Sequence, residues 1–96
     1  MKIRWSPRSI DRIIEIGDYI AKDSPLTALR VMKSIFESVE RLELFPKSGR
    51  IVPEFGNPEI REVIHNPYRI LYQEFENAVE ILTVIHSRQL LTGDSI

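Results

Sequence analysis

The 96-residue chain contains no cysteine, which excludes disulfide bonds and any metal site built on thiolate ligands. None of its apolar stretches approaches the roughly 18 consecutive residues that a membrane-spanning helix requires. Lysine and arginine (13) nearly balance aspartate and glutamate (14), which leaves a net charge of −1. Proteins that grip nucleic acid non-specifically are usually basic, because phosphate neutralisation supplies most of their affinity. The composition therefore argues against such a protein, although it is compatible with a local basic patch.

Motifs that carry several kinds of chemistry are also missing from the chain. It has no His-x-x-x-His pair and no loop rich in aspartate and asparagine, the patterns that bind zinc and calcium. It also lacks a glycine-rich phosphate loop and the turn that carries a nucleophilic serine. Met1–Arg4 leads straight into helix signals, without the apolar core of a signal peptide. We therefore expect a cytoplasmic protein that uses no metal ion and no other cofactor.

The chain is long enough to form one modest core. Hydrophobic residues make up 43% of it and charged residues 28%, as is ordinary for a globular protein. By the usual scaling of surface with mass, a chain of this size buries roughly 65% of its surface on folding. No internal repeat, low-complexity run or linker interrupts the sequence. We predict a single domain over residues 1–96.

The strongest local signal is a pair of apolar runs, Tyr68–Phe75 and Val79–His86, separated by the polar residues Glu76-Asn77. Both runs are rich in β-branched and aromatic residues, and asparagine is a natural turn residue, so the pattern predicts a β-hairpin. The second run is apolar on both alternating faces, which is typical of a strand covered on both sides in the middle of a sheet. One face would carry Ile81, Thr83 and Ile85, and the other Leu82 and Val84.

Two Ser-Pro pairs predict the starts of two helices, because serine caps a helix and proline suits its first position. After Ser6, apolar residues at helical spacing predict a helix over Pro7–Lys22. After Ser24, a second apolar stripe predicts a helix over Pro25–Leu44. The short break between the two implies an antiparallel helical hairpin. Each helix is apolar on one side only, so each should cover one face of a sheet.

Two further strands complete the predicted sheet. Lys2–Trp5 alternates over too few residues to resolve its faces and is expected at or near an edge. Ile60–His65 precedes the hairpin through a tight Asn66-Pro67 connection, while Ile51–Pro58 is expected to be irregular. The order β-αα-βββ predicts an α+β two-layer fold, an antiparallel sheet with the helical hairpin packed on one face. We expect five apolar residues to be buried in its core: Met32, Ile35, Leu82, Val84 and Ile85.

Basic residues, histidines and tyrosines gather at the open end and along one face of the predicted sheet. An antiparallel hairpin brings the start of its first strand beside the end of its second, so Arg69, His86 and Arg88 should lie close together. Arginines can stabilise an anionic transition state and histidine can move protons near neutral pH, which suits the cleavage of RNA. The simpler interpretation is that the arginines pair with Glu59, Glu62, Glu74 or Glu80 and that the histidines pack within the sheet. The wider set of candidates is Arg50, Arg61, His65, Arg69, Tyr72, His86 and Arg88.

Seven short motifs follow one another along nearly the whole chain. They are Trp5-Ser6-Pro7, Asp18-Tyr19-Ile20-Ala21, Leu42…Phe45-Pro46…Gly49-Arg50, Val52-Pro53-Glu54, Ile60-Arg61-Glu62, Tyr68-Arg69-Ile70…Tyr72 and Ile81-Leu82-Thr83-Val84-Ile85-His86-Ser87-Arg88. In this order and at this length, the motifs resemble the RelE/ParE superfamily of toxins from bacterial and archaeal type II toxin–antitoxin systems. The fold of that superfamily agrees with the β-αα-βββ order derived above.

The resemblance implies a toxin that is neutralised by an antitoxin encoded beside it. Such antitoxins typically wrap a disordered, amphipathic segment around the toxin and fold as they bind. Contact with operator DNA would run only through the antitoxin. We expect the antitoxin in the shallow groove between the helical hairpin and the sheet, or on the exposed sheet face. The superfamily divides by target, since RelE-type members cut mRNA on the ribosome and ParE-type members poison DNA gyrase.

Residue by residue, the resemblance favours the ParE side. Arg69 and Arg88 match the signature arginines of RelE-type nucleases. The lysines of those nucleases fall here on Ile60 and Glu62, and their tyrosine falls near Asp94. Ribosome-cutting members are also usually strongly basic, unlike this chain. The sequence thus predicts a ParE-like toxin of a plasmid-stabilisation module that binds a target such as gyrase and is not an enzyme.

Each target assigns its own residues to the site. A toxin that acts by binding would contact its target through Arg50, Arg61 and Tyr72. The alternative is a ribosome-dependent mRNA endonuclease, with the histidine as proton donor or acceptor beside the two signature arginines. Its catalytic residues would be Arg69, His86 and Arg88.

Overall fold

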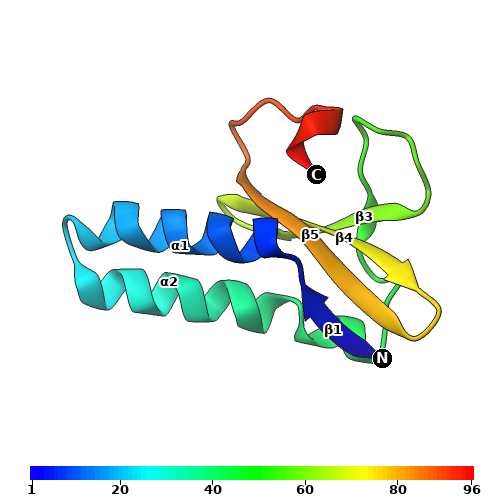
Figure 1. Cartoon of the computed structure of the whole chain (residues 1–96), viewed down its shortest axis with the longest axis horizontal. Coiled ribbons are helices and arrows are strands. Elements are labelled where there is room, and N and C mark those ends of the chain that lie inside the picture. Colours follow the sequence, from blue (N-terminus) through cyan, green and yellow to red (C-terminus); the bar gives the residue numbers. More distant parts are fainter.

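Serine caps begin both helices, which lie side by side as a hairpin. The computed structural model describes residues 1–96, in which α1 spans Pro7–Ala21 and α2 spans Pro25–Ser38. The hydroxyl groups of Ser6 and Ser24 each accept a backbone N–H from three residues further on, at 3.1 and 3.2 Å. Figure 1 shows the hairpin projecting well beyond the end of the sheet. Neither helix has the length and apolar character needed to cross a membrane.

The second helix is shorter than the predicted Pro25–Leu44. It ends at Ser38, and a 3-10 turn, η1, follows over Glu40–Glu43. Residues three apart lie on the same side of a 3-10 helix. The change of helix type therefore lets Val39 and Leu42 both point into the core, where both are fully buried.

Five strands form one sheet in the order β1-β5-β4-β3-β2. In chain order they span Lys2–Trp5 (β1), Arg50–Ile51 (β2), Ile60–His65 (β3), Tyr68–Phe75 (β4) and Ala78–His86 (β5). The predicted hairpin, the interior position of its second strand and the edge position of the first strand are confirmed. Two details are corrected. The sheet is mixed, because β1 runs parallel to β5, and it gains a short fifth strand, β2, at the start of the segment predicted to be irregular.

A β-bulge in β5 changes which of its side chains share a face. The register against β4 skips Leu82, so Ile81 and Thr83 pair with adjacent residues of the partner strand. Ile81 packs toward the helices, whereas Ile85 packs on the opposite side of the sheet. The prediction that Ile81, Thr83 and Ile85 line one face is therefore wrong, because the extra residue of a bulge breaks the period of two.

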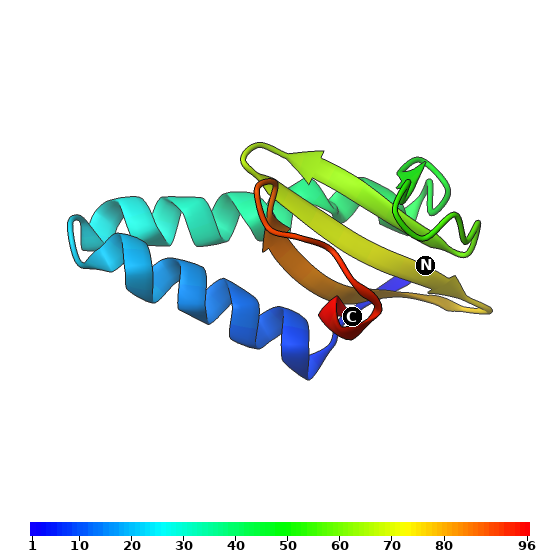
Figure 2. The same cartoon turned by 90° about the horizontal axis from the view of Figure 1, so that it is seen from above.

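The sheet separates two apolar clusters. The cluster between the sheet and the helices contains Ile13, Ile35, Val39, Leu42, Val63, Ile70, Tyr72, Val79, Ile81 and Val84. The far face, meaning the side of the sheet away from the helices, carries a smaller cluster of Val52, Ile60, Leu71, Ile85 and Leu91. Figure 2 shows the C-terminal segment turning back across the sheet and ending in a short 3-10 turn, η2, Gly93–Ser95. This segment supplies Leu91 to the far-face cluster.

The predicted core is confirmed in part. Three of the five expected residues are buried: Ile35, Val84 and Ile85. Leu82 is half-buried because it occupies the bulge, and Met32 is half-buried where the two helices approach each other. A β-carbon on Gly17 of α1 would lie only 2.4 Å from the Met32 sulfur, so the missing side chain of Gly17 makes room for Met32.

Candidate functional site

Arg69 stands at the centre of a chain of ion pairs on the far face. Its guanidinium group donates to Glu54 through two parallel bonds, Nη1 to Oε2 at 2.6 Å and Nη2 to Oε1 at 2.8 Å. Its Nε donates to Glu62 Oε1 at 2.6 Å. The other oxygen of Glu62 accepts from Arg50 Nε at 2.7 Å. The four charges alternate in sign, so each buried charge has a partner of opposite charge.

The members of this ion-pair chain are buried to different degrees. The side chain of Glu62 is fully buried and that of Arg69 is 9% exposed, whereas Glu54 is 39% exposed and Arg50 58%. Hydrogen bonds from Arg69 lower the pKa of the Glu54 carboxyl group from 4.5 to about 2. The carboxylates of Glu54 and Glu62 raise the pKa of the Arg69 guanidinium group above its usual range. Glu54 and Arg69 therefore both remain charged near neutral pH.

The strand register explains why three of these residues meet. Arg69 lies directly opposite Ile64 of β3, so Glu62, two residues away on the same face, is its diagonal neighbour. Arg50 of β2 lies directly opposite Glu62 on the other side. Glu54 belongs to no strand and reaches Arg69 from the connection between β2 and β3.

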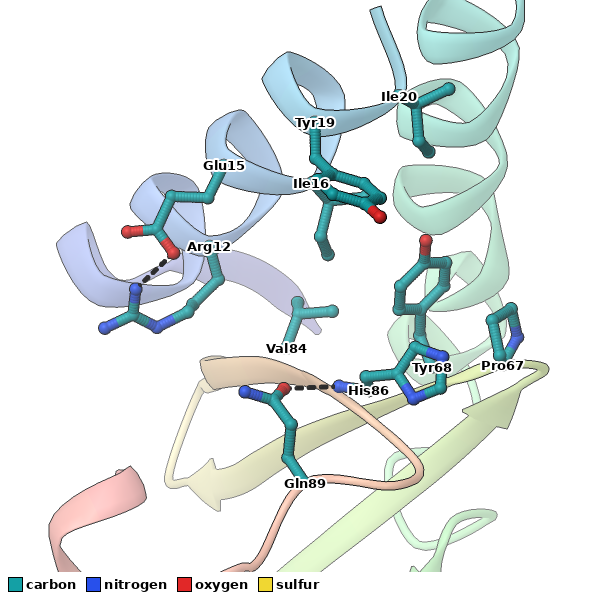
Figure 3. A pocket seen from close by; sticks show the side chains of 10 residues that line it. All are labelled: Arg12, Glu15, Ile16, Tyr19, Ile20, Pro67, Tyr68, Val84, His86 and Gln89. Atoms are coloured by element: carbon teal, nitrogen blue, oxygen red, sulfur yellow. Dashed lines mark hydrogen bonds and ion pairs between the residues drawn. The ribbon is translucent and has the colours of Figure 1, made fainter. Parts of the chain in front are cut away.

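A cleft of about 590 Å³ opens on the other side of the sheet, between α1 and the place where β4 begins and β5 ends. Figure 3 shows Ile16 from α1 and Val84 from β5 pointing toward each other across it. Its size falls within the range of about 300–1,000 Å³ found for small-molecule sites. The lining residues come from both layers: Arg12, Glu15, Ile16, Tyr19, Ile20, Pro67, Tyr68, Val84, His86 and Gln89.

His86 lines this cleft and is held by the turn that ends β5. Its ring packs edge-on against Tyr68, with the ring centroids 6.0 Å apart. Its Nδ1 accepts the backbone N–H of Arg88 at 3.1 Å, so the neutral ring carries its proton on Nε2. The side-chain oxygen of Gln89 accepts the backbone N–H of His86 at 2.7 Å (Figure 3). The backbone N–H of Gln89 donates to the C=O of His86 at 2.9 Å. The hydrogen bond to Nδ1 and the contact with Tyr68 together hold the orientation of the imidazole ring.

Tyr72 supports the turn that leads into β2. It is fully buried, so its ring does not reach the surface on which a target would bind. Its hydroxyl group donates to the C=O of Pro46 at 2.7 Å and accepts the N–H of Gly49 at 2.9 Å. Burial raises the pKa of this phenol. Arg61 contacts the same turn, because its Nη1 donates to the C=O of Gly49 at 2.9 Å.

The seven predicted site residues do not form one cluster. Arg69 pairs across the hairpin with Ile85, and its neighbour Tyr68 pairs with His86. Neighbouring residues of a strand point to opposite faces, so Arg69 and His86 lie on opposite sides of the sheet. The two residues lie at the same end of the sheet, as expected, but their side chains do not form one site because they are on opposite faces. Arg88 is exposed beyond the end of β5, and no hydrogen bond or ion pair engages its side chain.

His65 has a structural contact that the sequence does not predict. Its Nε2 lies 2.9 Å from the hydroxyl group of Ser34, which links β3 to α2. No group of three or more histidine, aspartate or glutamate side chains is arranged to hold a metal ion.

The helical hairpin exposes large apolar side chains near its free end, the end that projects beyond the sheet in Figure 1. Monomeric proteins rarely expose extended apolar patches unless they bind something there. We call three residues on either side of the turn, which are 57–75% exposed, the hairpin patch: Tyr19, Leu26 and Leu29.

The sequence of this chain matches a known family of toxins. Residues 3–91 match the family described as the ParE toxin of the type II toxin–antitoxin system, parDE. The chain belongs to the ParE toxin family. It is 41% identical to the protein named "Putative toxin Y4kP" of Sinorhizobium fredii, over 92% of this chain and 90% of that protein. It is 29% identical to "Toxin RelE2" of Caulobacter vibrioides, over 93% of this chain and 98% of that protein.

Solved structures share the fold of this ParE-family chain. One describes the chromosomal ParDE system of P. aeruginosa, with a TM-score of 0.76 and 21% identity over 90% of this chain and 95% of that chain. Another describes the toxin–antitoxin complex RelBE2 of Mycobacterium tuberculosis, with a TM-score of 0.55 and 19% identity over 88% of this chain and 95% of that chain. At these identities the likeness concerns the fold, a helical hairpin on a five-stranded mixed sheet.

For this ParE-family chain, reasoning from the sequence anticipated that Glu62 could pair with an arginine but missed Glu54. The motif Val52-Pro53-Glu54 contributes to the family resemblance, yet nothing local in it points toward Arg69. The expected groove between the helical hairpin and the sheet is present as the cleft under α1, although the sequence did not assign His86 to that groove.

Proposed function

We propose that this ParE-family toxin acts in the cytoplasm by binding its target, with DNA gyrase as the target to test first. The observation that supports binding over RNA cleavage is the engagement of Arg69. Carboxylates occupy its Nε, Nη1 and Nη2, and its side chain is only 9% exposed. An arginine that stabilises charge on a reacting phosphate must direct free N–H groups at that phosphate. Glu54 and Glu62 accept four of the five N–H groups of Arg69, so Arg69 could direct more than one N–H at a phosphate only after losing one of these bonds.

The distribution of the other nuclease candidates supports the same proposal. A general acid or base must come within about 3 Å of the proton it transfers. His86 lies on the helix side of the sheet, whereas Arg69 lies on the far face. These two side chains would thus have to act on one substrate from opposite sides of the sheet.

We assign target contact to the edge of the sheet that carries β2. Arg50 and Arg61 lie there, and Tyr72 supports the adjoining turn from beneath. Leu44 and Phe45, in the loop before that turn, are both strongly exposed. Arginine and aromatic side chains dominate the binding energy of many protein interfaces, so this combination suits a protein target.

We assign antitoxin binding to the hairpin patch. The two solved structures described above are of toxin–antitoxin systems, which supports an antitoxin as the partner. An amphipathic segment that folds on binding can bury exposed apolar side chains of two neighbouring helices. The projecting hairpin in Figure 1 offers such a surface without disturbing the sheet.

The test is inducible expression of this chain alone in a bacterial host, with DNA supercoiling and mRNA integrity followed in the same culture. We expect growth arrest with altered supercoiling or DNA breaks while mRNA stays intact. Purified protein should inhibit supercoiling by gyrase, and the double variant Arg50→Ala/Arg61→Ala should be weaker while remaining folded. An intact supercoiling reaction at micromolar toxin would count against gyrase as the target.

A ribosome-dependent mRNA endonuclease is the second candidate, and one observation favours it. Arg88 is exposed, without a side-chain partner, directly beyond the fixed imidazole of His86. Under this alternative, the same culture would show rapid mRNA cleavage with normal DNA. Arg88→Ala would then abolish the cleavage without reducing the thermal stability of the domain.

A further inference from the structure

The two carboxylates on Arg69 are held in unequal ways. Glu62 is fully buried on β3 and also accepts a hydrogen bond from Arg50, so it has a second reason to stay in place. Glu54 is 39% exposed, and Arg69 is the only residue that binds its two carboxylate oxygens. The Glu54 side chain can therefore reach water by rotation, whereas Glu62 cannot.

The connection that carries Glu54 is anchored without this ion pair. Val52 is fully buried in the far-face cluster, and Phe55 packs against the same cluster. The C=O of Val52 accepts N–H groups from Phe55 at 3.3 Å and Gly56 at 3.2 Å, and Gly56 has the positive φ (59°) that closes this turn. Release of the Glu54 carboxylate therefore leaves the turn in place.

We propose that Nη1 and Nη2 of Arg69 form a carboxylate-binding fork that Glu54 fills in the free chain. On complex formation, an acidic side chain of a partner protein takes the place of Glu54. The fork keeps its compensating charge throughout, because Glu62 remains bound to Nε. Only the identity of the partner protein that supplies the acidic side chain rests on the proposed function.

The surroundings of the fork favour a carboxylate over a phosphate. Two parallel N–H···O bonds at 2.6 and 2.8 Å match the planar shape of a carboxylate. Glu62 contacts the same guanidinium group, so a doubly charged phosphate would meet stronger repulsion than a singly charged carboxylate. The net charge of −1 likewise offers no general attraction to a polyanion.

While Glu54 occupies the fork, an external carboxylate binds there more weakly. The reason is that the Glu54 carboxylate is tethered to the same chain and so is present at a high effective concentration. Removal of Glu54 should therefore expose the fork to a soluble carboxylate. The matched control is Glu59, an exposed glutamate of the same connection whose side chain makes no ion pair. Glu54→Ala empties the fork, Glu54→Gln keeps the size of the side chain without its charge, and Glu59→Ala removes a carboxylate elsewhere.

The experiment is an NMR titration of the chain alone with sodium acetate, at ionic strength held constant with chloride, following the Nε–H signal of Arg69. We expect saturable shifts in Glu54→Ala and in Glu54→Gln, with half-saturation at least about tenfold lower than in the wild type. Glu59→Ala should behave as the wild type does. A parallel titration with inorganic phosphate should give weaker binding than acetate.

Two results would overturn the proposal. If Glu54→Ala and Glu54→Gln fold but respond to acetate no more than Glu59→Ala, the fork does not accept an external carboxylate. If phosphate binds the emptied fork more tightly than acetate, the assigned ligand is wrong and a phosphate source takes its place. Neither measurement involves gyrase, ribosome or antitoxin, so failure here is distinguishable from failure of the proposed function.

Discussion

At the scale of single residues, burial distinguishes the two arginines that the sequence treats alike. Arg69 and Arg88 both match signature positions, yet Arg69 is enclosed by carboxylates and Arg88 is open to solvent. The simpler interpretation of the sequence, that arginines pair with nearby glutamates, holds for Arg69. Replacement of Arg69 by alanine should therefore lower the stability of the fold, whereas replacement of Arg88 by alanine should not.

Arg69→Ala should strongly destabilise the fold. It leaves Glu62 fully buried with only Arg50 to compensate its charge, and removing one partner of a buried ion pair typically costs about 3–5 kcal/mol. Arg88→Ala should change the free energy of unfolding by less than about 0.5 kcal/mol, because its side chain touches nothing that folding requires. Urea unfolding of both variants, followed by circular dichroism, checks this. Similar midpoints would show that the ion-pair chain contributes little to stability.

Glu54 should make stability depend on acid. Its pKa in the folded protein, about 2, lies below its ordinary value of 4.5 because Arg69 stabilises the charged form. A group with a depressed folded pKa contributes stability above its unfolded pKa and loses that contribution as the pH falls through its folded pKa. The contribution should be complete above about pH 5 and vanish toward about pH 2. Urea unfolding at about pH 6 and about pH 3 should show a smaller acid loss in Glu54→Gln than in the wild type.

At the scale of elements, the turn before β2 lies so close to the sheet that Gly49 has no room for a side chain. This close approach can be tested by its effect on stability. A β-carbon on Gly49 would lie 2.5 Å from the Tyr72 hydroxyl oxygen and 2.6 Å from the C=O of Glu62. Because the second contact is backbone, Gly49→Ala must shift the chain, at a cost of about 1–3 kcal/mol. Gly93 has no atom within 4 Å of such a carbon. Thermal unfolding should show a clear drop for Gly49→Ala and almost none for Gly93→Ala.

The prediction from the sequence agrees best with the structure for elements that depend on residues close together in the chain. The Ser-Pro starts of α1 and α2 and the hairpin of β4 and β5 depend on residues adjacent in the chain. The end of α2 does not, because Val39 and Leu42 enter the core only when the helix tightens into η1. The short strand β2 likewise exists only because β3 is beside it to pair with.

At the scale of the whole molecule, the hairpin patch should separate neutralisation from toxicity. Leu29 is 66% exposed, so Leu29→Asp should fold normally and remain toxic. An added carboxylate in an apolar interface is costly to desolvate, so the cognate antitoxin should no longer rescue growth or co-purify with the variant. Asn57→Asp, which adds one carboxylate at an exposed position in the connection between β2 and β3, is the control. Full rescue of both Leu29→Asp and Tyr19→Asp by the antitoxin would place the antitoxin elsewhere.

The candidate site shows the limit of sequence reasoning more clearly than the fold does. The sequence correctly placed Arg69 at the start of one strand and His86 at the end of its neighbour. The motifs alone do not show that Arg69 and His86 lie on opposite faces of the sheet. They also assign no role to Glu54, because Glu54 lies outside any helix or strand. Helices and strands show a regular spacing of apolar residues in the sequence, whereas an ion pair between distant segments leaves no such pattern.

By itself, the amino-acid sequence determined the two capped helices, the central hairpin, the two-layer class and the family resemblance. The helices, the hairpin and the two-layer class follow from capping, turn chemistry or hydrophobic spacing between residues close in the chain, whereas the resemblance rests on the order of the seven motifs. Only the tertiary structure decided that β1 runs parallel to β5, that the bulge at Leu82 reverses the faces of β5, and that Glu54 occupies Arg69. These features arise from contacts between distant segments, whose free energy depends on packing and charge that no local pattern records.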